Sequence, residues 1–419
     1  MNFFSTSEEL ATEIRKIASP LLSNNRNILP DWLSEDKQLI FKKSLIVCGT
    51  TSKEEIRALA KNFNIISIVD DDLSKKWQWL YGIPLISTSK WIDIAKSNQE
   101  IISLVLVGTL RAYRHFIKQS IQHSLKYLTP LQILHILRDN NVQVIPNGLI
   151  SRYGLDYFDF ALCNLDELID QRTIFVDEYS KISYLNILCY KLTLNPFYLE
   201  NTAVGRGNHY DYNTYLFERT YLQLENDEVY VDAGAFTGDS LQCFLFAVKG
   251  QFKHIYSFEP DEKNNDEIRK RITKLQQFYL KPLQESISII EKGVWSKDEI
   301  LHFSTAMDHD LGGHIVETGM NADYDRRKTV SMAVTSIDAA TNQDATFIKY
   351  EVEGSELEAL VGAQKTIVKN KPKLAVALYH KAEDILTLPK YLRNLDMDYK
   401  IGFRQHDPYK PDATYCYCS

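Results

Sequence analysis

The sequence predicts an α/β protein with two domains, each built around a mainly parallel sheet. Short apolar runs of strand length alternate with amphipathic stretches of helix length through most of the 419 residues. This alternation is interrupted over residues 151–225 and then starts again. Strands that alternate with helices are typical of parallel sheets covered by helices. A chain of this length is also expected to form more than one hydrophobic core.

The first domain is predicted over residues 41–150, after a helical segment over residues 1–40. Its strands are expected at residues 44–50, 65–72, 82–88 and 102–109, where apolar side chains predominate. Helices between these strands would give a small Rossmann-like fold. Gly49 stands alone after the first strand and lacks the glycine spacing of a phosphate cradle. Two interpretations remain: a domain without a ligand, and a domain in which Asp70 or Asp71 contacts a ribose.

A connector is predicted over residues 151–225, which are rich in Tyr, Asn and Asp and lack long strand-like runs. We expect helices and loops here. The polar and aromatic stretch NTAVGRGNHYDYNTY (201–215) stands just before the second domain. It is either a lid that forms a wall of a substrate site or a plain connecting loop.

The second domain is predicted over residues 226–419. A strand over VYVDAG (229–234) leads into a helix whose apolar residues share one face. These residues are Leu241, Phe244, Leu245 and Val248. Further strands are expected within HIYSFEPD (254–261), ISIIEKGVWS (287–296), EILHFS (299–304), ATFIKYEVEGSE (345–356), PKLAVALYH (372–380), YKIGFRQ (399–405) and TYCYC (414–418).

The stretch EVYVDAGAFTGDS (228–240) indicates a strand, a tight glycine turn and the start of a helix. Such a turn brings bare backbone close to a ligand, at the positive end of the helix dipole. Gly234 and Gly238 are present, but Ala235, Phe236 and Thr237 fill the space between them. The turn is therefore less bare than the G-x-G loop that holds a pyrophosphate.

The acidic residue Glu259 ends the next predicted strand, in FEPD. A carboxylate at this place can accept hydrogen bonds from both hydroxyls of an adenosine ribose. Sites for nicotinamide cofactors and for S-adenosylmethionine (SAM) share this feature, and a solvated carboxylate at a strand end is the alternative. Only one α/β domain follows Gly234. This length suits a SAM-dependent methyltransferase domain, whereas a dehydrogenase usually needs a further substrate domain.

Several segments of the second domain resemble the FkbM family of SAM-dependent methyltransferases. They are VDAGAFTGDS, YSFEPD, TSID, FIKYEVEGSELEALVGAQKTI and PKLAVALYHKAEDI, and the similarity covers about residues 210–419. The resemblance implies a seven-stranded Rossmann-like methyltransferase fold whose last strand is antiparallel. It also implies transfer of a methyl group from SAM to a hydroxyl, often of a sugar in a surface polysaccharide, glycolipid or secondary metabolite.

The resemblance places the cofactor site on the first two strands of this domain. The residues concerned are Asp232, Gly234, Ala235, Phe236, Gly238, Asp239, Glu259 and Pro260. A second block with the residues Lys349, Glu353, Gly354 and Glu356 matches the fourth strand of the family. The chain departs from the family at Glu351, where the family usually has Asp, and its carboxylate reaches one methylene further.

The catalytic candidates are Glu351, Glu353 and His380, which follow two predicted strands. Sites of α/β proteins form at the carboxyl ends of parallel strands. A sugar hydroxyl is a weak nucleophile, so a carboxylate or imidazole that accepts its proton should assist the transfer. Two alternatives stay open: the carboxylates form a structural ion pair with Lys349, and His380 is a structural histidine.

No metal site is predicted. His309, Asp310 and His314 lie in a glycine-containing loop, but their spacing fits no familiar site. Cys416 and Cys418 share a strand face without a second ligand pair. The six cysteines are scattered and several lie within apolar runs, so we expect reduced thiols in a cytoplasmic protein.

The favoured function is a SAM-dependent O-methyltransferase with a saccharide or glycoconjugate acceptor. A net charge of −7 argues against nucleic acid as the main partner, and no apolar run has membrane-spanning length. One alternative is a nicotinamide-dependent oxidoreductase or epimerase of sugar nucleotides, which the missing G-x-G-x-x-G disfavours. Another is a non-catalytic two-domain binding protein, which the joint presence of Asp232, Gly234, Glu259 and Glu353 disfavours.

Overall fold

The computed structural model describes most of the chain. Described are residues 6–419 except 24–28, 35–36, 50–55, 58, 75, 108–109, 140–153, 205–217, 306–313, 316–327, 396–397 and 409–412. The stretch 201–215, expected to be a lid or a connector, lies mostly outside the described residues. Among the described helices, none has both the length and the apolar character needed to cross a bilayer.

The chain folds into two compact units. The N-terminal unit comprises Met1–Arg172, Ile182–Gly207 and Asp407–Pro411. The C-terminal unit comprises Thr173–Lys181, Asn208–His406 and Asp412–Ser419. The chain therefore passes between the units several times, which a division of the sequence into consecutive domains does not anticipate.

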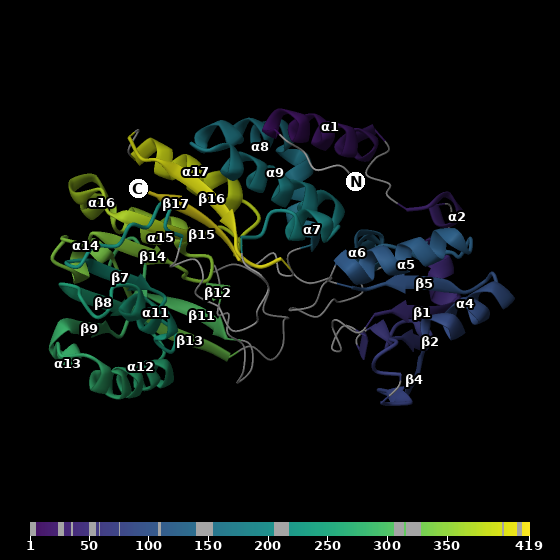
Figure 1. The fold of residues 1–419 in the computed structure, drawn as a ribbon, viewed down its shortest axis with the longest axis horizontal. Coiled ribbons are helices and arrows are strands. Elements are labelled where there is room, and N and C mark those ends of the chain that lie inside the picture. Colours follow the sequence, from purple (N-terminus) through teal and green to yellow (C-terminus); the bar gives the residue numbers. More distant parts are fainter. Residues whose placement is uncertain are drawn as a thin grey trace. The chain divides into compact units, whose positions relative to one another are not determined.

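The N-terminal unit contains a six-stranded sheet in the order β3-β4-β2-β1-β5-β6 (Figure 1). Its strands are β1 (Ser44–Cys48), β2 (Asn64–Val69), β3 (Trp79–Leu80), β4 (Ile83–Ile86), β5 (Ile102–Val105) and β6 (Tyr127–Leu128). All neighbours pair in parallel except β3 and β4, which form an antiparallel hairpin. The central strands β1 and β5 are almost wholly buried, as expected for a parallel sheet covered on both faces.

Helices surround this sheet in the sequence. They are α1 (Ser7–Ser23), α2 (Asp31–Ser34), η1 (Lys37–Lys42), α4 (Thr88–Ser97), α5 (Leu110–Gln122), α6 (Pro130–Asp139), α7 (Gly154–Cys163), α8 (Leu165–Gln171), η2 (Arg172–Ile174), α9 (Glu178–Thr193) and α10 (Phe197–Glu200). Helix α4 begins after Ser87, whose side chain accepts a hydrogen bond from the Lys90 N–H. It buries Trp91, whose indole N–H donates to the Ser103 hydroxyl at 3.0 Å.

The C-terminal unit contains a seven-stranded sheet in the order β16-β17-β15-β14-β7-β8-β9. Its strands are β7 (Val229–Ala233), β8 (His254–Phe258), β9 (Ile287–Ile290), β14 (Phe347–Tyr350), β15 (Lys373–Ala377), β16 (Ile401–Gln405) and β17 (Thr414–Cys418). Only β17 runs against its neighbours, β15 and β16. In Figure 1 the strands follow one another from the yellow β16 to the green β9. The predicted α/β fold with its antiparallel last strand is confirmed.

A smaller sheet and several helices complete this unit. The sheet has the order β10-β13-β11-β12, with β10 (Gly293–Val294), β11 (Glu299–Thr305), β12 (His314–Ile315) and β13 (Lys328–Thr335). The helices are α11 (Asp239–Ala247), α12 (Glu262–Leu275), η4 (Gln276–Phe278), α13 (Leu283–Ser286), α14 (Ile337–Ala340), α15 (Glu356–Val361), α16 (Gln364–Asn370) and α17 (Asp384–Leu395). His309, Asp310 and the side chain of His314 lie outside the described residues.

The core of the C-terminal unit holds the first strand in place. The ring of Tyr230 on β7 stacks on Phe244 of α11 at 4.3 Å and on Phe347 of β14 at 5.0 Å, measured between ring centroids. The four apolar residues predicted to share a helix face, Leu241, Phe244, Leu245 and Val248, are all buried. This packing fixes the start of α11 and therefore the glycine turn before it.

The outer edge of β16 is covered by the segment Thr173–Lys181. The Val176 N–H donates to the Ile401 carbonyl at 3.0 Å, and the Phe403 N–H donates to the Ser180 hydroxyl at 3.0 Å. Backbone groups that an edge strand would leave unpaired are thus satisfied within the unit. The segment protects the sheet edge that ends at the functional side of the molecule.

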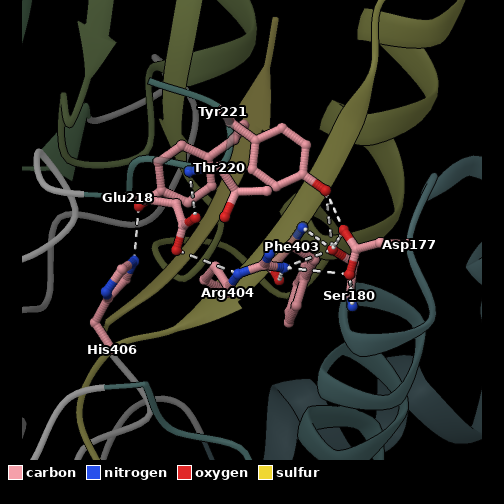
Figure 2. A network of polar contacts seen from close by, with 9 residues as sticks. Asp177, Ser180, Glu218, Thr220, Tyr221, Phe403, Arg404 and His406 are labelled. Atoms are coloured by element: carbon pink, nitrogen blue, oxygen red, sulfur yellow. Dashed lines mark hydrogen bonds and ion pairs between the residues drawn. The ribbon is translucent and has the colours of Figure 1, made fainter. Parts of the chain in front are cut away.

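Arg404 of β16 ties this segment down, as Figure 2 shows. Its buried guanidinium lies 3.7 Å from Asp177 and 3.3 Å from Glu218, and it donates to the Ser180 hydroxyl at 2.7 Å. The Tyr221 hydroxyl donates to Asp177 on the other side. Burial raises the pKa of Asp177, but the Tyr221 and Ser180 hydrogen bonds and the charge of Arg404 lower it further, so this carboxylate is ionised.

Replacing Arg404 by Met is expected to destabilise the C-terminal unit by about 3 kcal/mol, because two largely buried carboxylates lose their cation. The measurement is the thermal midpoint of the full chain by calorimetry. Arg269→Met is the matched control: Arg269 pairs with Asp266 and Glu291 at the surface, where an ion pair contributes about 1 kcal/mol or less. Equal shifts for the two variants would refute a structural role of the Arg404 network.

Candidate active site

The glycine turn after β7 is held against the end of β14. Gly234 has φ +86°, and a Cβ there would lie 1.9 Å from the Glu351 carbonyl oxygen, so no other residue fits. The N–H groups of Gly234 and Ala235 donate to the Phe258 carbonyl at 3.2 and 2.9 Å. The turn thus joins the ends of β7, β8 and β14, which are neighbours in the sheet.

A buried lysine crosslinks this turn to two carboxylates. The Lys349 Nζ donates to the Gly234 carbonyl at 2.6 Å and lies 3.2 Å from Asp232 and 3.3 Å from Glu351. Asp232 also accepts a hydrogen bond from the Ser240 hydroxyl at 2.5 Å. Burial lowers the pKa of Lys349, but the two carboxylates outweigh this effect and raise it, so the lysine is charged. Asp232 therefore positions the turn rather than facing solvent.

Glu259 is a second acidic group of the turn. Its Oε2 accepts from the Phe236 N–H at 2.9 Å, and its Oε1 accepts from the Asp261 N–H at 2.9 Å and the Asn264 amide at 3.3 Å. A carboxylate has about four acceptor positions, so three are occupied and one remains. Burial raises the pKa of Glu259 to about 7. Such a buried carboxylate gains from any further hydroxyl donor.

The turn offers little to a pyrophosphate. The N–H groups of Gly234, Ala235, Phe236 and Gly238 all donate to acceptors within the chain. The turn presents a close backbone surface rather than free N–H donors. Asp239 begins α11, and Pro260 follows Glu259 on the way to α12.

Glu351 lies at the end of β14 between the lysine and two tyrosines. Its Oε1 accepts from the Tyr379 hydroxyl at 2.5 Å and from the Tyr415 hydroxyl at 2.9 Å. Burial raises the pKa of Glu351, but Lys349 and the Tyr379 hydrogen bond lower it more, so the side chain is ionised. The ion pair with Lys349 that the sequence left as an alternative is present.

His380 joins two further carboxylates. Its Nδ1 donates to Glu356 Oε1 at 2.8 Å, and its Nε2 lies 3.7 Å from Glu353. Burial lowers the pKa of His380, but the fully buried Glu356 outweighs this and raises it to about 9. The imidazole is therefore an imidazolium at neutral pH. Glu353 itself is 40% exposed and has φ +55°, a conformation that a non-glycine residue adopts at a cost.

The predicted site residues thus gather at one edge of the sheet, in two groups. The cofactor candidates lie at the ends of β7 and β8, and Glu351, Glu353 and His380 lie at the ends of β14 and β15. Lys349 connects the groups. Cys416 and Cys418 are buried in β17. Within the described residues, no three His, Cys, Asp or Glu side chains are arranged to hold a metal ion.

Sequence reasoning did not anticipate Tyr379 and Tyr415 at this site, nor the partnership of Glu356 with His380. Tyr379 directly precedes His380 at the end of β15 and was available from that position. Tyr415 enters because β17 pairs with β15 in a register that sets it opposite Ala377. That register depends on the sheet order, which no local pattern indicates.

Solved structures share this fold. The FkbM methyltransferase of Methylobacillus flagellatus KT is 23% identical, with a TM-score of 0.74 over 99% of this chain and 100% of that chain. A candidate rRNA-methylase of Clostridium thermocellum is 12% identical over 49% of this chain and 91% of that chain, with a TM-score of 0.31. A candidate methyltransferase of Streptococcus mutans in complex with SAH is 14% identical over 49% and 93%, with a TM-score of 0.30.

The sheet order and the full-length likeness define an α/β fold of the methyltransferase type. Residues 232–401 match the model of the Methyltransferase FkbM domain. This part of the chain belongs to the FkbM methyltransferase family. A comparison with curated proteins gave no significant match.

Proposed function

We propose that the protein is a SAM-dependent O-methyltransferase that acts on a hydroxyl of a saccharide or glycoconjugate of the surface-polysaccharide or glycolipid type. One observation carries the choice of cofactor: the turn has spent its N–H donors internally, while ionised carboxylates lie beside it. This setting disfavours an anionic pyrophosphate and favours a cationic ligand. It therefore speaks for SAM and against a nicotinamide cofactor.

The residues present fit SAM. Glu259 would accept hydrogen bonds from the ribose hydroxyls, since its carboxylate is oriented by backbone donors and keeps an open acceptor position. The backbone surface at Gly234 would pack against the ligand. The negative charge of Glu351 would favour the cationic end. When bound, SAM supplies an electrophilic methyl group.

The proton of the acceptor hydroxyl is assigned to Glu353. This carboxylate is partly exposed, and the His380 imidazolium beside it fixes its direction. Glu356 keeps His380 charged from the buried side. Glu351, whose Oε1 already accepts two tyrosine hydroxyls, orients the acceptor rather than taking its proton. All six cysteines are free thiols, which supports a proposal that the enzyme works in the reducing cytoplasm.

The function is tested by calorimetric titration of the full chain with SAM, S-adenosylhomocysteine and NAD. We expect both SAM compounds to bind and NAD to give no signal. Transfer of a labelled methyl group from SAM to a panel of oligosaccharides then tests the acceptor class. Binding of NAD without either SAM compound would refute the proposal.

Binding of SAM is expected to release protons near neutral pH. The pKa of Glu259 is about 7 without a ligand, and ribose hydroxyl donors would lower it because they favour the charged form. Affinity should be full above pH 7 and should fall as the pH drops below 7. Calorimetry in two buffers of different ionisation enthalpy measures the proton count. Proton uptake on binding would contradict the role of Glu259.

A further inference from the structure

The hairpin β3–β4 of the N-terminal unit exposes three aromatic side chains within five residues. Trp77 is 63% exposed, Trp79 59% and Tyr81 47%. These three residues are called the aromatic hairpin below. Large aromatic rings are normally buried in a core or an interface, and a group of exposed rings marks a binding surface. None of the three belongs to the site of the C-terminal unit.

The aromatic hairpin is held rigidly. Trp79 pairs with Pro84 and Leu80 with Ile83 in antiparallel register. On the return strand β4, Ile83 and Leu85 are buried and anchor the hairpin to the sheet. The rings therefore stand on a fixed base and lose little conformational freedom when a ligand binds.

The turn of the hairpin is strained in a way that the core does not explain. Tyr81 and Gly82 have φ +53° and φ +77°, the two left-handed positions of a tight hairpin turn. Asn, Asp or Gly usually occupy the first of these positions, and a bulky residue there is an outlier. Since Tyr81 is half exposed, its ring contributes little to packing. Strain of this kind is a feature of functional sites.

We infer that the aromatic hairpin binds a saccharide chain by ring stacking. A sugar ring has an apolar C–H face that covers an indole or phenol ring, and a polar rim that needs hydrogen-bond partners. Trp77 and Trp79 are two residues apart, about 6–7 Å along an extended strand, so that consecutive sugars can each meet a ring. The exposed Gln78 stands between them, and the Arg57 guanidinium lies 5.9 Å from the Tyr81 ring.

The size of the surface favours this ligand over a protein. At their printed exposure, the three side chains offer about 400 Å², since such residues bury 150–250 Å² each. A stable protein interface takes about 800 Å² per partner. The aromatic hairpin is therefore too small to hold a second copy of the chain, but it suits a few sugar units. The inference builds on the proposed saccharide acceptor and adds a second contact for it, remote in sequence from the methyl-transfer site.

The test uses the full chain, a printed oligosaccharide array, and dextran and hyaluronan as soluble probes. We expect binding to at least one saccharide, with quenching of tryptophan fluorescence. The double variant Trp77→Ala/Trp79→Ala should lose this affinity by at least about tenfold, as expected when stacking contacts are removed. Phe278→Ala is the matched control, because Phe278 is an exposed aromatic residue of the C-terminal unit. It should bind like the native protein.

A second variant separates function from folding. Tyr81→Asn should raise the thermal midpoint, because Asn tolerates the left-handed turn, and should weaken saccharide binding at the same time. A ring with a merely structural role would give the opposite change in stability.

Three results would overturn the inference: no binding by the native chain to any probe, unchanged binding by the double variant, or a change from dimer to monomer in sedimentation without a change in saccharide affinity. SAM affinity is measured in parallel. Its absence in the native chain would refute the proposed function and leave saccharide binding standing.

Discussion

The variant Glu353→Gln is expected to reduce turnover by about 10²-fold or more while SAM affinity stays within about twofold. The amide keeps the shape of the side chain but cannot accept the hydroxyl proton, and general-base assistance contributes about 10²–10⁴ in rate. Turnover is measured by transfer of a labelled methyl group to the saccharide found in the acceptor panel. Glu383→Gln is the control, since Glu383 is an exposed carboxylate on the loop after His380. Equal losses in both variants would contradict the assignment.

The pH dependence distinguishes Glu353 from His380 as the proton acceptor. The pKa of His380 is raised to about 9, so the imidazolium persists below that pH and is lost above it. If its charge holds Glu353, kcat/KM should be level from about pH 7 to 8 and fall above about pH 9. If His380 were the base, kcat/KM would instead rise towards pH 9. Glu356→Gln should move the alkaline limb to lower pH, because it removes the carboxylate that keeps His380 charged.

The second large effect is expected for Glu259→Ala, which should weaken SAM binding about 100-fold. Hydrogen bonds to a charged group contribute about 1.5–3 kcal/mol each, and about 3 kcal/mol corresponds to this factor. Calorimetric titration with SAM and with S-adenosylhomocysteine measures the loss, which should be the same for both because they share the ribose. Glu262→Gln, an exposed carboxylate at the start of α12, is the control. An unchanged affinity in Glu259→Ala would remove the ribose contact from the proposal.

The fold class and much of the site followed from local sequence patterns. The alternation of strands and helices, the turn at Gly234 and the acid at Glu259 are short-range features, and the parallel sheet brings strand ends together by geometry. The charge state of His380 was not accessible in the same way. It depends on Glu356, 24 residues earlier in the chain, and on the burial of both groups.

Other details of the site depend on contacts between distant segments. The role of Phe236 lies in its backbone N–H, which orients Glu259, and not in its ring. The consequence of Glu351 in place of Asp also needed the structure: the longer side chain meets Lys349 on one oxygen and Tyr379 and Tyr415 on the other. The sequence identified the departure but offered no partner for the extra methylene.

The position of β17 between β15 and β16 has a consequence for how the chain folds. Both neighbours precede it in the sequence, and their facing edges stay unpaired until residues 414–418 insert between them. An intermediate without this strand would expose two open edges, which are templates for aggregation. It would also lack Tyr415 beside Glu351. Completion of the sheet and completion of the active-site wall are thus a single late event, so partially folded chains would be inactive.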